Sequence, residues 1–187
     1  YEEFDRCERI YFGKEDVPDK EKKNMKRLYE LSCVKIPKKM GDQTTFRHLT
    51  TLVQIHDGNI KEAVKNIDSE RVQTRAECSF NWIKEHAPED FKFKVHETIT
   101  VEVLEHLTPE QKNSLIALRD LISKKKYDDL TLFNEFYSIC EAQGINNIDF
   151  FKGAYLAIIG KKKGPRLANF ILSLGQERVV KLLDGIK

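Results

Sequence analysis

The chain has 187 residues, of which 40% are hydrophobic and 33% are charged, so it can bury a core and is too apolar for an intrinsically disordered protein. Its formal net charge of only +2 argues against a general nucleic-acid-binding protein. Its apolar runs fall short of the ~20 residues that cross a bilayer, and its four cysteines form no C-x-x-C pair that would indicate a disulfide framework or a zinc site. We therefore expect a cytoplasmic protein with reduced thiols that does not act at a membrane.

Residues 1–38 are predicted to form a helical connection. The charged start YEEFDRCERIYFGKED has a helical pattern and lacks the apolar segment of a signal peptide. The chain also opens on Tyr1 rather than on methionine. We therefore expect these residues to be a piece of a longer protein.

A first helical lobe is predicted for residues 39–90. The stretch DQTTFRHLTTLVQI predicts a helix capped near Asp42, with Phe46, Leu49 and Val53 facing inward. The stretches NIKEAVKNI and DSERVQTRAECSFNWIKEHA predict two more helices. These patterns place the apolar core of the lobe between its helices.

Residues 88–100 are predicted to be an extended connection between two lobes. Their alternating polar and apolar side chains are typical of a strand, but no second stretch offers a pairing partner, and a single strand is not stable alone. The second helical lobe is therefore predicted for residues 91–187.

The clearest helix start of the chain lies in the stretch HLTPEQ. Thr108 can serve as the N-cap, Pro109 as the first helical residue and Gln111 as the reciprocal partner of a capping box. The next stretch, YDDLTLFNEFYSICEAQG, predicts a helix that ends at Gly144. Its apolar face is predicted to carry Leu130, Phe133, Phe136, Tyr137 and Cys140.

Another helix is predicted to begin with Asn147 as its cap and to end at Gly160 in the left-handed conformation. Pro165 is then predicted to open the following helix, since its fixed φ suits the first turn. The predicted buried positions of these two helices are Ile148, Phe151, Tyr155, Ile158, Leu167, Phe170, Ile171 and Leu174. Taken together, the signals predict an all-α protein with two small helical lobes after a helical connecting segment.

The turn GKKKGPRL at residues 160–167 is the strongest candidate for an anion-binding site. Residues 152–187 carry eight Lys and Arg against two acidic residues, a net charge of +6, which leaves −4 for the rest of the chain. The sequence has no acidic residue between Phe150 and Gln176, so we expect a positive field that attracts phosphates. The helix N-terminus that follows the turn would strengthen it. A solvated basic turn without a ligand is the alternative.

Catalytic and metal-binding patterns are lacking in the sequence. His86, His96 and His106 recur at an interval of ten, which fits neither one helical face nor a zinc signature. A phosphate-binding P-loop is excluded because no Ser or Thr follows the lysines of the turn. We therefore expect neither a catalytic residue nor a metal site.

Three stretches resemble the C-terminal part of class I lysyl-tRNA synthetases. They are ERIYFG at residues 8–13, FRHLTTLVQI at residues 46–55 and FFKGAYLAIIGKKKGPRLANFILSLGQERVVKLL at residues 150–183. The last stretch is also similar to the end of bacterial glutamyl-tRNA synthetases. The resemblance implies an anticodon-binding region folded as an α-helix cage, preceded by the tail of the segment that joins it to the catalytic domain.

The same resemblance has implications for cofactors and partners. The HIGH-type and KMSKS-type signatures of class I synthetases are missing here, and in the family they lie upstream, in the catalytic domain of the same chain. The full-length enzyme would use ATP and Mg²⁺ to load lysine onto lysine tRNA. These residues alone are expected to be inactive and to bind no cofactor.

The resemblance also implies which residues contact RNA. In glutamyl-tRNA synthetases, the positions equivalent to Gly164, Pro165, Arg166 and Leu167, together with those of Lys152 and Tyr155, face the anticodon. Tyr155 stands where that relative has an arginine. Bases of an unpaired anticodon can stack on aromatic or guanidinium planes.

On this basis Tyr155 is the candidate for stacking and Arg166 is the candidate donor to a base edge or phosphate. Lys161, Lys162 and Lys163 are candidates for the RNA backbone, and Arg47 is a further candidate on the first lobe. Tyr155 could instead be a packed ring whose hydroxyl reaches the surface. Two alternative functions remain open, namely the corresponding region of a glutamyl-type synthetase and a helical protein-interaction module with a basic turn.

Overall fold

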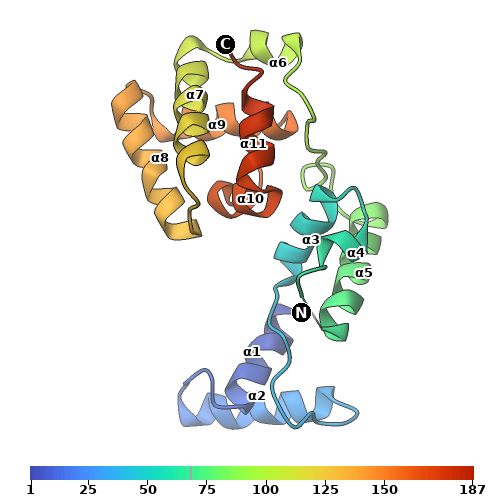
Figure 1. Ribbon diagram of the computed structural model, residues 1–187. Helices are drawn as coiled ribbons and strands as arrows, with labels where there is room; N and C mark the ends of the chain where they lie inside the picture. The colour runs from blue at the N-terminus through green and yellow to red at the C-terminus, as the bar shows by residue number, and fades with distance from the viewer. Residues whose placement is uncertain (68) are drawn as a thin grey trace. The chain divides into compact units, whose positions relative to one another are not determined.

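The computed structural model describes residues 1–67 and 69–187 (Figure 1). Within these residues the only regular secondary structure is the α-helix, so the predicted all-α fold class is confirmed. The chain divides into two compact units, Tyr1–His86 and Ala87–Lys187. Each unit is described separately below.

The first unit contains two helical groups. Helices α1 (Glu2–Tyr11) and α2 (Asp19–Ser32) pack against one another, whereas α3 (Phe46–Ile55), the short α4 (Ile60–Ala63) and α5 (Glu70–Glu85) pack together. The second group encloses an apolar core. Its buried residues are Leu49, Leu52, Val53, Ala63, Val64, Val72 and Ala76.

The N-cap of α3 differs from the prediction. The Thr45 side chain accepts a hydrogen bond from the His48 N–H at 3.2 Å and caps the helix. Asp42 instead accepts a hydrogen bond from the Thr44 N–H at 2.7 Å, in the turn before the helix. Two residues of this stretch can cap, and Thr45 lies directly before the first helical residue, so it takes the role.

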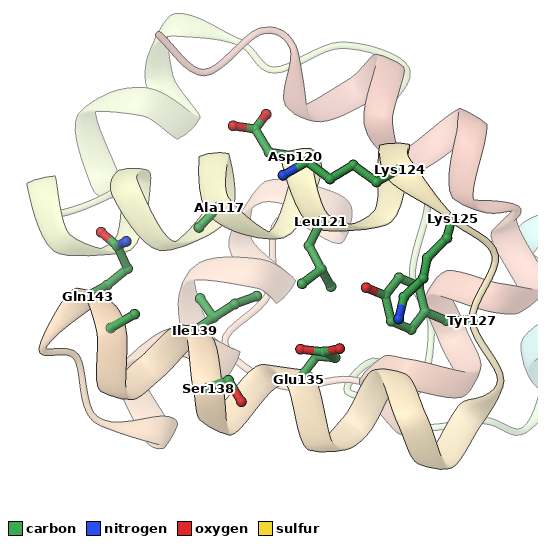
Figure 2. A pocket seen from close by; sticks show the side chains of 11 residues that line it. Ala117, Asp120, Leu121, Lys124, Lys125, Tyr127, Glu135, Ser138, Ile139 and Gln143 are labelled. Atoms are coloured by element: carbon green, nitrogen blue, oxygen red, sulfur yellow. The ribbon is translucent and has the colours of Figure 1, made fainter.

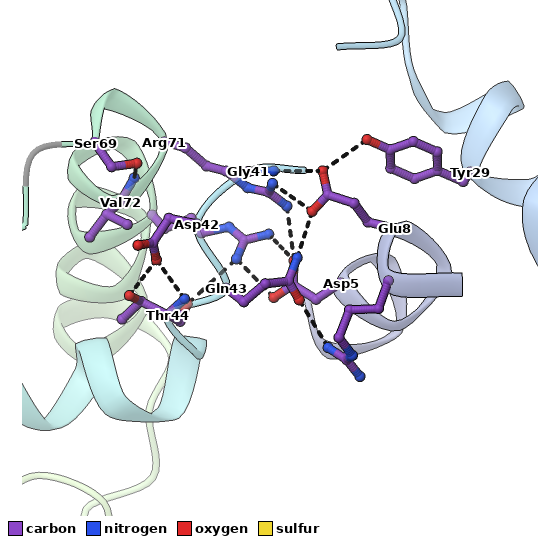
Figure 3. A network of polar contacts seen from close by, with 12 residues as sticks. Asp5, Glu8, Tyr29, Gly41, Asp42, Gln43, Thr44, Ser69, Arg71 and Val72 are labelled. Atoms are coloured by element: carbon purple, nitrogen blue, oxygen red, sulfur yellow. Dashed lines mark hydrogen bonds and ion pairs between the residues drawn. The ribbon is translucent and has the colours of Figure 1, made fainter. Parts of the chain in front are cut away.

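A buried ionic network connects α1 with α5 (Figure 3). Asp5 and Glu8, only 4% and 1% exposed, point from α1 toward two arginines of α5. Arg75 donates to Asp5 at 2.9 Å, and Arg71 donates to Glu8 at 2.7 Å. The Tyr29 hydroxyl of α2 also donates to Glu8, at 2.8 Å. These hydrogen bonds offset the desolvation of the two carboxylates.

The second unit is built around α7. It contains α6 (Val101–His106), α7 (Pro109–Lys124), α8 (Asp129–Gln143), α9 (Asn147–Ile159), α10 (Leu167–Leu174) and α11 (Gln176–Leu183). Helix α7 packs against α8, α9 and α11 (Figure 1). The largest fully buried side chains of the unit are Leu115, Leu118, Leu132, Phe136, Phe150, Ile158, Phe170 and Ile171.

Both ends of α7 are closed by side chains. The capping box predicted at its start is confirmed, because Thr108 accepts from the Gln111 N–H at 3.3 Å and the Gln111 side chain accepts from the Thr108 N–H at 3.0 Å. At its other end, the Gln176 amide donates to the carbonyls of Ile122, in the last turn, and of Lys125, the C-cap, at 2.9 and 2.8 Å. The same Gln176 side chain belongs to α11, so the cap joins two distant segments.

The predicted apolar face of α8 is partly wrong. Leu130, Phe133 and Tyr137 are 70%, 40% and 45% exposed, whereas the buried positions of the helix include Leu132 and Ile139. Helix α8 carries apolar side chains on two arcs, and periodicity alone does not say which arc faces the neighbouring helices.

The start of α9 also differs from the prediction. Its cap is Asn146, which accepts from the Asp149 N–H at 2.9 Å, and Asn147 is the first helical residue. Ile148 is 80% exposed, while Tyr155 and Ile158 are buried as predicted. None of the described helices is long and apolar enough to span a bilayer.

Candidate nucleic-acid interface

The basic turn lies between α9 and α10. Helix α9 ends at Gly160, whose φ of 68° is left-handed, as predicted, and whose N–H donates to the Leu156 carbonyl at 3.1 Å. Helix α10 begins at Leu167, and Arg166 occupies its N-cap without a side-chain cap bond. Pro165 therefore precedes the helix and does not open it, which corrects the prediction for Pro165.

Tyr155 packs against the turn. Its side chain is only 8% exposed, and its hydroxyl donates a hydrogen bond to the Pro165 carbonyl. Burial of the phenol disfavours its charged form and raises the pKa of Tyr155 to about 12. The buried ring lacks the open face that base stacking needs, so the structure does not fit the stacking role expected for Tyr155.

The ring of Tyr155 also explains the glycine of the turn. A Cβ atom at Gly164 would lie 2.8 and 2.9 Å from two ring carbons of Tyr155 and 3.0 Å from the Ile159 side chain. Such distances are too short for a carbon side chain, so only glycine allows the backbone to approach the ring this closely. Tyr155, Gly164 and Pro165 thus fix the turn to the end of α9.

Two of the three lysines of the turn contact the segment that precedes α6. The Lys161 ammonium donates to the Glu89 carbonyl at 2.6 Å, and the Lys163 ammonium lies 3.0 Å from the Asp90 carboxylate. The hydrogen bond from Lys163, together with its charge, lowers the pKa of Asp90. The positive field is therefore partly cancelled, contrary to the expectation from the local sequence.

His96 holds the same segment against α9. Its N–H donates to the Ile158 carbonyl at 2.9 Å, and its ring Nδ1 lies 3.0 Å from the Ala157 carbonyl. Residues 88–100 contain neither helix nor strand, and they lie in the second unit. Sequence reasoning missed the roles of Glu89, Asp90 and His96, because more than 60 residues separate each from its partner.

The remaining candidates differ in their exposure. Arg166 is exposed, as is Lys162, whereas Lys152 is half-buried on α9. Leu167 is only 3% exposed, so its side chain belongs to the core and does not fit an RNA contact. Arg47 is exposed on α3 and belongs to the first unit.

A cavity of about 530 Å³ lies between α7 and α8 (Figure 2). Leu121 and Ile139 contribute apolar side chains, and Lys125 stands with Tyr127 at one end, its ammonium 4.6 Å from the ring centroid. No residue of the basic turn lines this cavity. Among residues 1–67 and 69–187, no group of three or more His, Cys, Asp or Glu side chains could hold a metal ion.

Comparison with known proteins identifies the chain's relatives. Lysine-tRNA ligases are 37% identical in Borrelia garinii subsp. bavariensis, 35% in Thermococcus kodakarensis and 31% in Treponema pallidum. Each match covers 98% of this chain but only 36 to 37% of the relative. The chain thus spans little more than a third of the length of these relatives.

A family model gives the second comparison. The model described as "Anticodon binding domain" matches residues 43–186, a range that includes the turn and the segment that contacts it. The match extends over most of the chain and over helices of both units. The chain therefore belongs to the anticodon binding domain family.

Proposed function

We propose that these residues bind the anticodon loop of lysine tRNA as part of a longer lysine-tRNA ligase. The observation that carries the proposal is the family match over residues 43–186, combined with relatives that are lysine-tRNA ligases. These relatives favour lysine tRNA over the tRNA of a glutamyl-type enzyme. They also favour RNA recognition over a protein-interaction module.

The longer protein would charge lysine tRNA in the cytoplasm, using ATP and Mg²⁺ in an upstream catalytic domain of the same chain. The HIGH-type and KMSKS-type sequences are missing from residues 1–187. ATP and Mg²⁺ would therefore be held outside these residues. The role of the present chain would be to select the tRNA.

The turn offers exposed Arg166 and Lys162 to an RNA ligand, beside Lys163, which is also exposed but contacts Asp90. The Arg166 guanidinium can stack on a splayed base or donate to a base edge, and Lys162 can meet a phosphate. The N–H groups in the first turn of α10 favour an anion at the same place, because Arg166 provides no side-chain cap. Lys161 and Lys163 would exchange their contacts with residues 89 and 90 for phosphates.

In this mechanism Tyr155 is a positioning residue. Its hydroxyl fixes the Pro165 carbonyl and its ring fixes Gly164, so the backbone that carries Arg166 is held before RNA arrives. A preorganised turn binds more tightly because less conformational entropy is lost on association. Lys152 lies on the same helix and Arg47 lies in the other unit, and both remain candidates for peripheral phosphate contacts.

The test is a titration of the protein with the anticodon stem-loop of lysine tRNA and with a stem-loop whose second and third anticodon uridines are cytidine. Arg166→Ala should weaken binding of the uridine form by about 5-fold to 150-fold, because a stacked base contributes about 1–3 kcal/mol. The logarithm of the binding constant falls linearly with the logarithm of the salt concentration. Lys162→Ala should reduce the magnitude of that slope by about 0.7, as expected for the loss of one phosphate contact on a single strand. Lys181→Ala, which removes an exposed cation of α11, is the matched control.

Equal affinity for the two stem-loops at every salt concentration would refute anticodon recognition and leave a generic basic turn. Tighter binding of a glutamate anticodon stem-loop would instead assign the chain to a glutamyl-type enzyme. The same measurement therefore separates the proposal from both alternatives.

A further inference from the structure

The second unit exposes a row of apolar side chains on α8. Leu130 is 70% exposed, Phe133 is 40% exposed and Tyr137 is 45% exposed. Because these residues are three and four positions apart, their side chains lie on one side of the helix, over a length of about 10 Å. We call these three residues the α8 stripe. Exposed apolar clusters of this kind mark interaction sites on soluble proteins.

The other sides of α8 already have neighbours. Leu132 and Cys140 are buried in the core of the unit. Glu135 lines the cavity between α7 and α8, together with Lys124 and Lys125 (Figure 2). Since a helix turns by about 100° per residue, Glu135 and the cavity lie on the flank of α8 that is opposite to the stripe. The α8 stripe is therefore the side of the helix that this unit leaves uncovered.

The two rings of the stripe are fixed in place. The centroid of the Phe133 ring lies 5.3 Å from that of Tyr137 and 6.4 Å from that of Phe136, which is only 1% exposed. Side chains that are ordered before association lose little conformational entropy on binding, and aromatic residues are enriched in protein interfaces. The stripe thus has the composition and the rigidity of a protein-binding surface.

The charge around the α8 stripe is negative. Residues 128–149, from the cap of α8 into α9, contain five acidic residues and no Lys, Arg or His. Two of the acidic residues, Asp129 and Glu141, are exposed beyond the two ends of the stripe. They are twelve positions apart, which corresponds to about 18 Å along the helix axis. This acidic surface contrasts with residues 152–187, whose net charge is +6.

We propose that the α8 stripe binds an amphipathic helix of another protein, with apolar side chains on one side and Lys or Arg beside them. An acidic rim attracts such a helix, whereas it repels the phosphates of RNA and the equally acidic stripe of a second copy. The bound helix lies along α8 with its apolar anchors three and four positions apart. Its cations, about three helical turns apart, face Asp129 and Glu141. The basic turn takes no part, so this inference does not rest on the proposed function.

Binding of helical peptides to the longer protein, expressed from its complete reading frame, tests this inference. The probe is a labelled peptide of about 14 residues, with Leu at the spacing of an amphipathic helix and Lys at the other positions. One counterpart has Glu in place of Lys, and the other has Ala in place of Leu. Fluorescence anisotropy should show that the Leu–Lys peptide binds at least about 10-fold more tightly than either counterpart. Equal binding of the Leu–Lys and Ala–Lys peptides would indicate charge attraction alone and would overturn the proposal.

Paired substitutions locate the bound peptide. Leu130→Ser should weaken binding of the Leu–Lys peptide by about 10-fold, whereas Val101→Ser, at a position of α6 that is 71% exposed, should leave it unchanged. Glu141→Lys should weaken binding, whereas Glu177→Lys, at an exposed position of α11, should not. Equal effects within each pair would place the peptide elsewhere on the protein and overturn the proposal.

A photoreactive amino acid in place of Asn134, which is exposed on α8 one turn from Leu130, identifies the natural occupant in the cell. Crosslinks to a helical segment of another protein that is rich in Lys or Arg are expected. Crosslinks only to RNA, to a second copy or to the same chain, or no crosslink at all, would overturn the proposal. Leu130→Ser should leave stem-loop binding unchanged, so a failure of anticodon recognition would refute the proposed function alone.

Discussion

At the scale of single residues, the turn depends on the buried aromatic side chain of Tyr155. The Tyr155 hydroxyl bonds to the Pro165 carbonyl, and its ring occupies the space that a side chain at Gly164 would need. The two contacts fix successive residues of the turn, and Arg166 follows them directly. A buried tyrosine can therefore influence recognition through the geometry of the backbone that it holds.

The raised pKa of Tyr155 predicts a loss of stability at alkaline pH. An unfolded tyrosine titrates near pH 10, whereas burial raises the pKa of Tyr155 to about 12. Since the unfolded state releases the proton first, the contribution of this residue is complete below about pH 10 and declines as the pH rises to 12. Tyr155→Phe should therefore show a shallower fall of the thermal midpoint across this range than the wild-type protein.

The control for this measurement is Tyr137→Phe, which alters a tyrosine that is 45% exposed on α8. The thermal midpoint of this variant should fall with rising pH as steeply as that of the wild-type protein, because the substitution leaves Tyr155 in place. Parallel declines of the wild-type protein and the Tyr155→Phe variant would show that Tyr155 does not carry the effect.

At the scale of elements, the two glycines that end α8 and α9 have the same conformation but different surroundings. Gly144 and Gly160 have φ values of 63° and 68°. A Cβ at Gly144 would meet no atom within 4 Å, whereas one at Gly160 would lie 3.1 Å from the His96 ring. Gly144 is therefore needed only for its left-handed backbone conformation. Gly160 is needed for the same conformation and also because its missing side chain leaves room for His96, in the segment that contacts the lysines.

Alanine at the two glycines separates these effects. Gly144→Ala should lower the free energy of unfolding by about 1 kcal/mol, the usual cost of a left-handed non-glycine residue. Gly160→Ala should lower it further and should also weaken stem-loop binding, because His96 must move. Urea unfolding followed by circular dichroism measures the first quantity, and the titration measures the second. Equal losses and unchanged binding for both variants would contradict this account.

The helix ends also show what local sequence can predict. The capping box of α7, the end of α8 at Gly144 and the left-handed end of α9 at Gly160 were predicted correctly, because each depends on residues within a few positions of one another. Thr45 and Asn146 were missed as caps because a neighbouring Asp or Asn can take the same role. Tertiary packing decided which face of α8 is buried, and no local pattern carried that information.

At the scale of the whole molecule, each unit is stabilised by contacts between residues distant in sequence. In the first unit, Asp5 and Arg75 pair although 70 positions separate them. In the second unit, Lys163 pairs with Asp90 across a similar separation. The local sequence predicted the basic turn, but not the acidic segment that partly neutralises its lysines, because that segment is brought there by the fold.

The network of the first unit predicts a large effect of a single substitution. Arg75→Met should lower the free energy of unfolding by about 3 kcal/mol, because it leaves the carboxylate of Asp5, 4% exposed, without its main partner. Fluorescence of Trp82, the single tryptophan of the chain, reports on this unit. Lys84→Met, which removes an exposed pair with Glu85, should change the value by less than about 1 kcal/mol.

The Gln176 cap has a consequence for the order in which the second unit folds during synthesis. Its amide satisfies carbonyls of Ile122 and Lys125, which leave the ribosome 54 and 51 residues earlier. Until α11 emerges, α7 lacks both this cap and a packing surface. The full set of contacts that holds the C-terminal end of α7 can therefore form only after α11 has been synthesised.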